Sequence, residues 1–465
     1  MARKAQRLSS NPHDESGTID FVDEPLGWLY AASRRGALAV VSRPRSATDA
    51  ESTYGTVAVF GQDAVRRVLS DIEVFGMPQS MSSRHELPPI LANLNSAVFS
   101  MTGARHRSRQ QLLARLLGPP GTAEHHAAID RGIEIFLRGL LVGRDVCLLQ
   151  EMRRLARLVA AQVILGMDDS DGEIGIQIQK YFDQRRSYAS RFAVRTSQDR
   201  DALVAQGTLV DGLLRARVGA LRRQRSGPAR GVLGYLCRYG EDPNLGFTED
   251  ELVAHANILF MASSEPIATA MAWILLACSQ RPGLRSAIRE EVVKEASSFS
   301  LLRGTVHEIL RLVPPSAIIA RLTTKEVRVA GVLLPPATEV LLSPFVEHRR
   351  AETFPSPLRF WPERWAESHP GPFQFLPFGN GCRSCLGKQI ALATLQRATA
   401  AILTAADPLL PYPQRLDWRV SITLLPATDP VIRLGYPGQR PMRGHMLSGP
   451  AAALLQPEET YLALG

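Results

Sequence analysis

One long apolar stretch restricts the fold more than any other feature of the chain. Residues 249–280 read EDELVAHANILFMASSEPIATAMAWILLACSQ, directly after Thr248. Thr248 and Glu251 have the spacing of a capping box, which predicts a helix start. At about 1.5 Å per residue, such a helix would span roughly 48 Å. Because the polar residues and proline of 263–266 interrupt the apolar run, we predict a buried core helix and not a membrane span.

Composition narrows the class of protein. The chain has 465 residues, 45% hydrophobic, and a formal net charge of +9. Its arginines are scattered along helical patterns instead of gathered in one run, so we expect a basic surface and no nucleic-acid site. The polar N-terminus resembles no signal peptide. We therefore expect a soluble, cytoplasmic protein without a membrane anchor.

The order of the patterns predicts a mainly α fold with a small β region. Helical patterns run almost continuously over 104–313, and a last helix is predicted over 386–405. Residues 1–25 are expected to be a mobile arm, and the Gly-, Pro- and Ala-rich tail 437–465 to be loosely ordered. Short β-branched segments predict strands at 56–60, 326–329, 339–342, 420–424 and 430–434.

Five cysteines in a chain of this length do not make a disulfide framework. Cys147, Cys237 and Cys278 lie in apolar surroundings and are expected in the core. Cys385 comes just before a helical pattern, and the N–H groups of a helix start favour a thiolate. The alternative for Cys382-x-x-Cys385 is a redox dithiol or half of a zinc site, but no second pair of ligands is nearby.

The loop FLPFGNGCRSCLG around Cys385 resembles the haem-binding signature of the cytochrome P450 family. Every fixed position is matched, at Phe378, Gly381, Arg383, Cys385 and Gly387. The resemblance implies the cytochrome P450 prism fold, as one domain over 1–436 that binds haem b. It implies Cys385 as the axial iron ligand, Phe378 as a shield for its sulfur, Arg383 as a partner of a haem propionate, and Gly379 beside the cofactor.

Two further motifs resemble the family in the expected order. Glu308 and Arg311 share a helix face in TVHEILRLVPP, and Arg364 lies in FWPERW. They are similar to the family's Glu-Arg-Arg network, which fixes this helix to the segment beneath the haem.

The resemblance also assigns two propionate partners. Arg321 is on the strand after the Glu308 helix, and His106 is on an earlier helix. The family often has a basic residue four positions after that histidine. Gln110 stands there, with Arg109 one step earlier, so the resemblance leaves open which of the two reaches the haem.

The long helix departs from the family pattern where oxygen is expected to bind. Ala262, Ser263 and Glu265 fit it, but Pro266 replaces the usual threonine. Because proline has no N–H, the carbonyl of Ala262 loses its helical partner, and we expect a kink. Ser263 or Ser264 is a candidate source of the missing hydroxyl, and Glu265 a candidate partner for an amine on the substrate.

By resemblance, the chain is a monooxygenase that oxidises a small organic molecule, free or carrier-tethered, in bacterial secondary metabolism. A ferredoxin and its reductase are the expected electron donors, with Lys388 and Arg397 as candidate docking residues, and a monomer is expected. Two alternatives remain: a peroxide-using or non-hydroxylating haem-thiolate enzyme, which Pro266 favours, and a non-catalytic haem-binding protein. The segments expected to face the substrate are 77–97, 182–197, 260–263 and 317–319, with Phe260, Ile318 and Ile319 as pocket residues.

Overall fold

The fold was analysed in a computed structural model of the chain. The residues that the structure describes are 20–42, 55–77, 88–167, 173–189, 196–224, 228–239, 246–294, 300–437 and 445–455. Most of the predicted arm 1–25 and residues 78–87 of the loop predicted over 77–97 lie outside this part of the chain. The described end of that loop contains a short helix, α3 (Pro89–Leu94).

The chain groups into two compact units, each assembled from several stretches of sequence. Unit 1 consists of residues 1–78, 317–357 and 370–383, and unit 2 of residues 79–316, 358–369 and 384–465. The sequence predicted one domain over 1–436. The separation into units follows contacts between distant segments, which no local pattern reveals.

Unit 1 is built on a five-stranded sheet of order β1-β2-β8-β5-β3. Strand β2 pairs in parallel with β8, with Thr56 opposite Glu339, and the other pairs in the sheet are antiparallel. Valine and leucine side chains of these strands and of α2 form its buried core. The elements of unit 1 are α1 (Pro25–Ser33), β1 (Leu38–Ser42), β2 (Thr56–Val59), α2 (Gln62–Ser70), β3 (Phe75–Gly76), β5 (Ile319–Thr323), β6 (Val327–Val329), β7 (Val332–Leu334), β8 (Glu339–Leu342), α13 (Pro344–Glu347) and the short 3-10 helix η4 (Gly381–Arg383).

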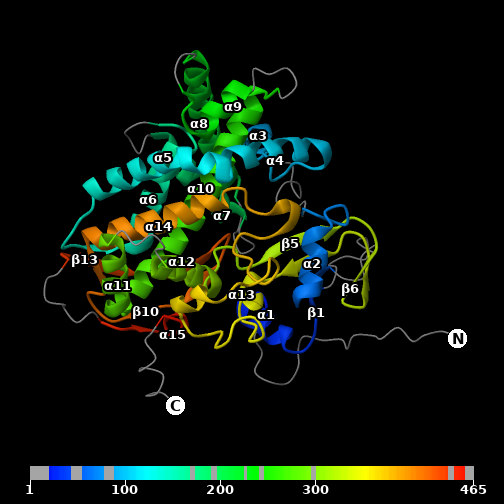
Figure 1. The fold of residues 1–465 in the computed structure, drawn as a ribbon. Coiled ribbons are helices and arrows are strands. Elements are labelled where there is room, and N and C mark those ends of the chain that lie inside the picture. The colour runs from blue at the N-terminus through cyan, green and yellow to red at the C-terminus, as the bar shows by residue number, and fades with distance from the viewer. Residues whose placement is uncertain are drawn as a thin grey trace. The chain divides into compact units, whose positions relative to one another are not determined.

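Unit 2 is mostly helical, and α10 runs among its other helices (Figure 1). The helices, with α3 above, are α4 (Gly103–Leu117), α5 (Pro119–Arg138), α6 (Leu148–Val163), α7 (Glu173–Ala189), α8 (Ser197–Arg223), α9 (Gly231–Tyr239), α10 (Glu249–Gln280), α11 (Pro282–Val293), α12 (Ser300–Leu312), the 3-10 helix η3 (Pro362–Ala366), α14 (Lys388–Ala405) and α15 (Pro450–Ala453). The strands are β4 (Asp145–Cys147), β9 (Asp407–Leu409), β10 (Gln414–Arg415), β11 (Trp418–Val420), β12 (Leu424–Pro426), β13 (Val431–Gly435) and β14 (Leu447–Ser448).

Helix α10 begins where the sequence predicted. The Thr248 side chain accepts the N–H of Glu251, and the Glu251 side chain accepts the N–H of Thr248, which completes the capping box. The helix is long and apolar enough to cross a membrane, but 78% of its most apolar window is buried inside the protein. Trp273 fixes it further, because its indole N–H donates to the carbonyl of Leu424, 3.0 Å away. α10 is therefore a core helix of unit 2, as predicted.

Part of the tail predicted to be loosely ordered is folded. Strand β14 pairs in parallel with β10, and the Leu447 N–H donates to the Gln280 side chain at the end of α10, over 2.9 Å. The α15 segment buries Ala451, Ala452 and Leu455 completely. The expectation was therefore wrong for residues 445–455, because their contacts are with residues far away in sequence.

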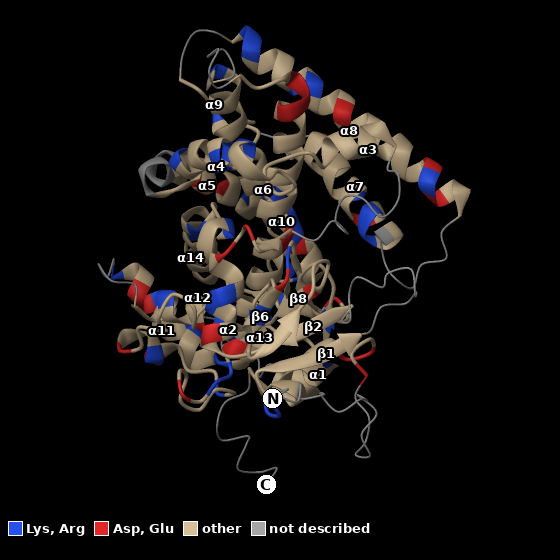
Figure 2. Ribbon diagram, turned by 90° about the vertical axis from the view of Figure 1, so that its right-hand side faces the viewer, with Lys and Arg blue, Asp and Glu red and all other residues tan. Residues whose placement is uncertain are grey.

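Two smaller expectations need correction. The predicted strand over 420–424 is the turn of a β-hairpin between β11 and β12, in which Val420 pairs with Leu424. Cys147 is exposed, although Cys237 and Cys278 are buried as expected. The basic residues are not gathered in a single-sign run on the long helix α8, which carries aspartates among its arginines (Figure 2).

Candidate functional site

The loop before Cys385 folds tightly within unit 1. Gly379 and Gly381 have positive φ angles of 63° and 73°. A Cβ at Gly381 would lie 2.1 Å from the carbonyl oxygen of Leu69, so only glycine fits there. The Leu376 N–H donates to Nε2 of buried His348, over 2.7 Å. These constraints give the loop one defined path.

Cys385 lies in unit 2, two residues before Gly387, the N-cap of α14. The residue has exposed surface, and its sulfur accepts a hydrogen bond from the Gly387 N–H. Burial of the sulfur among protein atoms raises the pKa of the thiol, against the lowering effects of that N–H and of Lys388. The helix start therefore does not by itself favour the thiolate, and a bound metal cation would supply the missing stabilisation.

Helix α10 is buried on nearly every side, but one narrow stripe in its middle is open. Ala262 is exposed, and Ile258, Ser263 and Pro266 are half-buried. Ile258, Ala262 and Pro266 are four residues apart and share one helix face. The exposure of Ala262 shows that this face of the core helix is not covered by packed side chains at that point. At Ala262, whose side chain is small, the stripe leaves room for a bound group to lie against the helix.

The two serines of α10 differ in position. Ser264 is buried, and its hydroxyl lies 2.9 Å from the Phe260 carbonyl and 3.3 Å from that of Met261. Ser263 is half-buried beside the open stripe, and its hydroxyl donates to the Phe260 carbonyl, over 3.1 Å. The helix runs through Pro266 without a break.

The surroundings of Glu265 do not fit its suggested role as a partner for an amine on the substrate. Its side chain is 2% exposed and receives two hydrogen bonds from Arg153 of α6, of 2.9 and 2.5 Å. Arg186 of α7 lies 3.8 Å from the same carboxylate. The carboxylate is thus already matched by cations of the protein. The idea that Glu265 pairs with an amine of the substrate has no support in this geometry.

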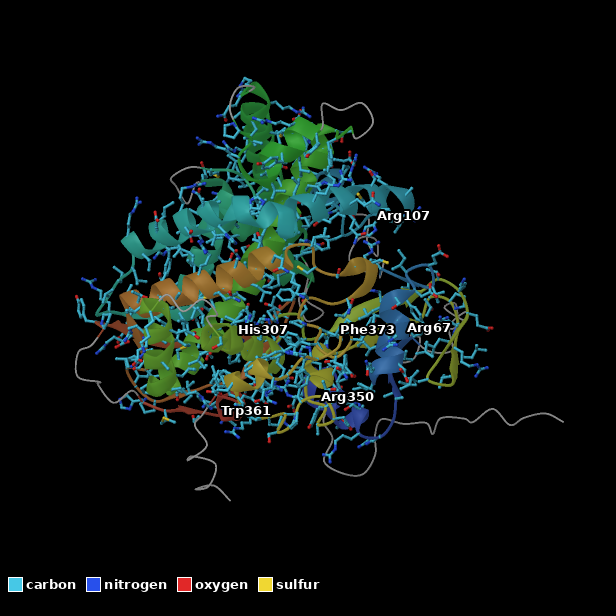
Figure 3. The ribbon with its side chains drawn as sticks, in the orientation of Figure 1. Arg67, Arg107, His307, Arg350, Trp361 and Phe373 are labelled. Atoms are coloured by element: carbon cyan, nitrogen blue, oxygen red, sulfur yellow. The ribbon has the colours of Figure 1, made fainter. Side chains whose placement is uncertain are left out.

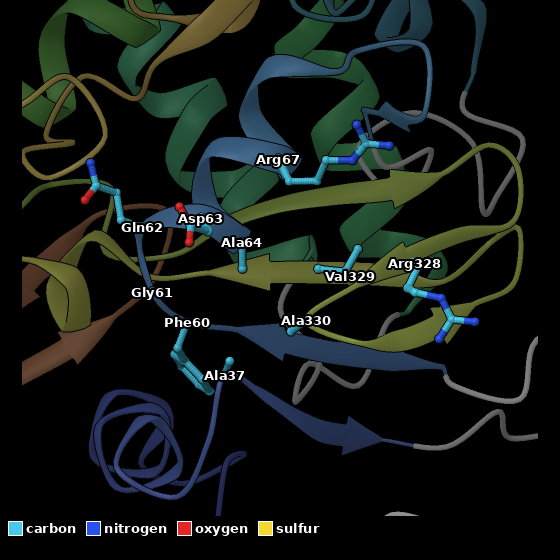
Figure 4. Close-up of a pocket in the computed structure, with 10 residues that line it drawn as sticks. All are labelled: Ala37, Phe60, Gly61, Gln62, Asp63, Ala64, Arg67, Arg328, Val329 and Ala330. Atoms are coloured by element: carbon cyan, nitrogen blue, oxygen red, sulfur yellow. The ribbon is translucent and has the colours of Figure 1, made fainter. Parts of the chain in front are cut away.

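Glu308, Arg311 and Arg364 are brought together in the interior of unit 2. The Glu308 carboxylate lies 2.8 Å from the Arg311 guanidinium and 3.1 Å from that of Arg364, and all three are buried. It also accepts the Trp361 backbone N–H and the Trp365 indole N–H, each over 2.9 Å. Figure 3 labels Trp361, and His307, whose ring packs on that of Trp365. So many donors satisfy the buried carboxylate and fix the 358–369 segment to α12.

The predicted basic residues lie in different units. In unit 1, Arg321 is 6% exposed, and burial, with repulsion from Arg383, lowers the pKa of its guanidinium to about 10. No carboxylate among the described residues forms an ion pair with Arg321. In unit 2, His106 and Arg109 are buried. Arg109 is 3.1 Å from Glu251 and stacks on Phe247. Its positive charge is therefore balanced by the Glu251 carboxylate at the start of α10.

Comparison with known proteins identifies the family. The cytochrome P450 family model matches residues 209–407, which include α10, α12, the cysteine loop and α14. The chain belongs to the cytochrome P450 family. It is therefore a haem-dependent oxidoreductase of the monooxygenase type.

Relatives and solved structures agree with this P450 assignment. A Mycobacterium bovis protein named cytochrome P450 139 is 26% identical over 384 residues, covering 77% of this chain and 86% of its own. Cyclooctatin synthase of Streptomyces melanosporofaciens is 25% identical and covers 73% and 78%. The cyanobacterial CYP120A1, solved with retinoic acid bound, has a TM-score of 0.72 at 23% identity and covers 82% of this chain and 89% of its own. It shows the P450 fold.

The residues of the P450 chain fit a haem group. In unit 2, Ala262 of α10 and Cys385 are exposed residues. In unit 1, Arg321 and Arg383 are close enough for their charges to repel, and two such cations suit the two propionates of a haem. Among the described residues, no three His, Cys, Asp or Glu side chains gather as a metal-binding group. A zinc site at Cys382 and Cys385 therefore finds no further ligands in that part of the chain.

Phe260, which the sequence predicts to line the substrate pocket of this P450, does not have the exposed surface that this role requires. Phe260 is completely buried, and its ring lies 3.1 Å from where a Cβ at Gly175 of α7 would stand. A side chain without exposed surface cannot line a ligand cavity, so Phe260 is a packing residue. Ile318 and Ile319 are both half-buried, and Ile319 packs on the core of unit 1.

Arg153 was missed, although it is the main partner of Glu265. It lies 112 residues before its partner and in no motif, so no local signal indicates the pair.

Proposed function

We propose that this P450 is a haem b monooxygenase with Cys385 as the axial iron ligand. The observation that carries the proposal is the position of Cys385, an exposed residue two positions before the N-cap of α14, whose sulfur accepts the Gly387 N–H. When bound, the haem supplies the iron that activates dioxygen, and the cysteine thiolate supplies the electron density that favours O–O cleavage. The chain itself must bind the haem, orient the substrate and deliver protons.

Haem retention is assigned to a small set of residues. Arg321, Arg383 and His106 are proposed partners of the propionates. For Arg321, the absence of a carboxylate partner among the described residues supports this role. From the family resemblance, Gly379 and Gly387 are proposed to lie beside the cofactor, and Phe378 is proposed as the shield of the sulfur. Arg109 is left out because Glu251 already binds it.

Ser263 is the better candidate for the hydroxyl that Pro266 displaces. It borders the open stripe and makes one internal hydrogen bond, whereas Ser264 is buried against two carbonyls. The Ala262 carbonyl is also available there, because Pro266 has no N–H to donate to it. We expect Ser263→Ala to lower the fraction of electrons that reaches product at least about tenfold. Ser264→Ala should change it much less, and equal losses in the two variants would remove Ser263 from this role.

A peroxide-driven or non-hydroxylating reaction is the second candidate. Its support is Pro266, which removes the distal hydroxyl that normally assists protonation, together with the Arg153 pair that holds Glu265. The two candidate reactions differ in the oxidant that they use, so the oxidant distinguishes them. Turnover with hydrogen peroxide alone, at a rate equal to that with dioxygen and an electron donor, would favour the second.

The family membership suggests an electron donor, a substrate class and a cellular location for this P450. A ferredoxin with its reductase is the proposed electron source, and Lys388 is exposed for docking. Arg397 is bound to Asp130 over 2.6 Å, so it is a poorer docking residue. Cyclooctatin synthase and cyclooctat-9-en-7-ol 5-monooxygenase, both from Streptomyces melanosporofaciens, are among the relatives. Their names favour a small organic molecule of bacterial secondary metabolism as the substrate. A carrier-tethered form of that substrate, a cytoplasmic location and a monomer are proposed from the family resemblance alone.

The deciding experiment is spectroscopy of the protein reconstituted with haem. A reduced, CO-bound protein with the absorption of a thiolate-ligated haem would support the proposal. A titration with small organic molecules should then shift the ferric spectrum from low to high spin for one class. Absence of a haem band after reconstitution would refute the proposed function.

A further inference from the structure

Arg185 of α7 occupies a position on the face of that helix that is otherwise buried and apolar. Ile178, Tyr181 and Phe182 face the interior of unit 2 and are buried. Arg185 follows at the next position of the same stripe, one turn after Tyr181, and is half-buried. The stripe therefore carries a guanidinium toward the interior, within the segment 182–197 that the sequence predicts to face the substrate.

Arg185 has no counter-charge among the described residues, which distinguishes it from its neighbours. Arg186 lies 3.1 Å from Asp183 and 3.8 Å from Glu265. Arg153 lies 2.5 Å from Glu265. In the same described part of the chain, no ion pair or hydrogen bond is formed by the Arg185 side chain. Burial lowers the pKa of its guanidinium, with only the Tyr181 hydroxyl opposing.

Tyr181 adds a second unused donor on the same stripe. Its oxygen accepts the Asn95 side-chain N–H over 3.3 Å, and its own O–H finds no acceptor among the described residues. The Asn95 side-chain oxygen is also buried without a partner there, but it is an acceptor and adds no donor for an anion. Burial raises the pKa of the Tyr181 hydroxyl, against the effect of Arg185, so this group stays a neutral donor. The region therefore has positive charge and donors that the described residues leave unmatched.

We propose that Arg185 binds a monoanionic group on the substrate, away from the carbon that is oxidised. The proposal rests on the proposed function. A half-buried cation without a partner is costly, and a ligand carboxylate or other oxyanion removes that cost through charge-assisted hydrogen bonds. One guanidinium balances one negative charge, which fits a carboxylate. It equally fits the phosphodiester of a carrier-tethered arm, and the two sources are separated below.

The test compares acids with their methyl esters on the haem-loaded protein. Decanoic and abietic acids and their methyl esters are titrated against the wild type, Arg185→Met, Arg186→Met and Tyr181→Phe, with haem absorbance as the readout. We expect at least one acid to bind wild type about tenfold more tightly than its ester, and Arg185→Met to lose this preference while still binding the ester. Decanoyl carrier protein against decanoyl-pantetheine tests the phosphodiester in the same way.

Thermal unfolding of the same variants gives a readout that needs no ligand. Removing an unpaired cation should leave the Tm of Arg185→Met equal to or above that of wild type. Arg186→Met breaks an ion pair and should have a lower Tm. The proposal is overturned if Arg185→Met loses as much stability as Arg186→Met, or keeps the preference for the anion. Loss of the haem spectrum in wild type would instead refute the proposed function and leave the Tm comparison to decide the role of Arg185.

Discussion

Two cysteines, three residues apart, lie in different surroundings at the loop before α14. Cys382 is exposed in η4, whereas the Cys385 sulfur accepts the Gly387 N–H next to α14. We expect Cys385→Ser to abolish the spectrum of a thiolate-ligated haem in the reduced, CO-bound protein. Cys382→Ser is the matched control and should keep it. Loss of the spectrum in both variants, with folding retained, would contradict the assignment.

The Arg153–Glu265 pair makes a second prediction at the residue scale. Arg153→Met leaves the Glu265 carboxylate buried, with only the more distant Arg186, so the free energy of unfolding should fall by about 3 kcal/mol. Glu265→Gln should cost less, because Arg153 is 20% exposed and partly hydrated. Urea unfolding measures both. If the double variant is no more stable than Arg153→Met alone, the loss does not come from the stranded charge.

At the scale of elements, two helix glycines predict opposite outcomes. A Cβ at Gly304 of α12 would lie 2.3 Å from the Pro362 carbonyl oxygen, whereas a Cβ at Gly283 of α11 would meet nothing within 4 Å. Gly304→Ala should push η3 away from α12 and cost about 1–3 kcal/mol. Gly283→Ala should instead be neutral or stabilise by up to about 1 kcal/mol. Thermal unfolding compares the two variants. Equal Tm values would show that η3 can move away from α12 without a loss of stability.

The start of α10 predicts a dependence of stability on pH. Burial alone would raise the pKa of Glu251, but hydrogen bonds from Arg109 and Arg105 bring it below the usual glutamate value. A lowered carboxyl pKa stabilises the fold above the unfolded value, about 4.3, and this contribution is lost as pH falls through the folded pKa. Glu251→Gln should therefore unfold at a lower temperature than wild type at pH 7. The difference should shrink below about pH 4; a constant difference would place the effect in packing instead.

Elements were predictable where their signals are local. Thr248 and Glu251 define the start of α10, and the four residues of β8 were predicted with the right ends. The β11–β12 hairpin was read as one strand because its turn contains neither glycine nor proline. The Arg153–Glu265 pair was not predictable, since it joins two helices that no motif links. That Arg185 has no counter-charge among the described residues can be recognised only once the ion pairs of its neighbours are known.

At the scale of the whole molecule, residues 445–455 extend the core of unit 2. Leu447, Ala451 and Leu455 are fully or nearly fully buried, and the Leu455 carbonyl accepts the Arg281 side chain over 3.0 Å. A chain ending at Pro437 should therefore lose at least about 3 kcal/mol of stability. Met446→Ser is the control, because that side chain is 43% exposed. Urea unfolding of the two variants tests this, and an unchanged midpoint for the shortened chain would show that the tail only rests on the surface.

The pairing of β2 with β8 has a consequence for synthesis on the ribosome. Thr56 contacts Glu339 across 283 residues of sequence. At 5–20 residues per second, the β1–β2 hairpin waits roughly 15–60 s for its parallel neighbour to be made. A two-stranded hairpin is marginal in water, so its apolar face stays open to chaperones and to other nascent chains during that delay. Translation speed between these strands is therefore expected to influence the yield of folded protein more strongly than translation speed after β8.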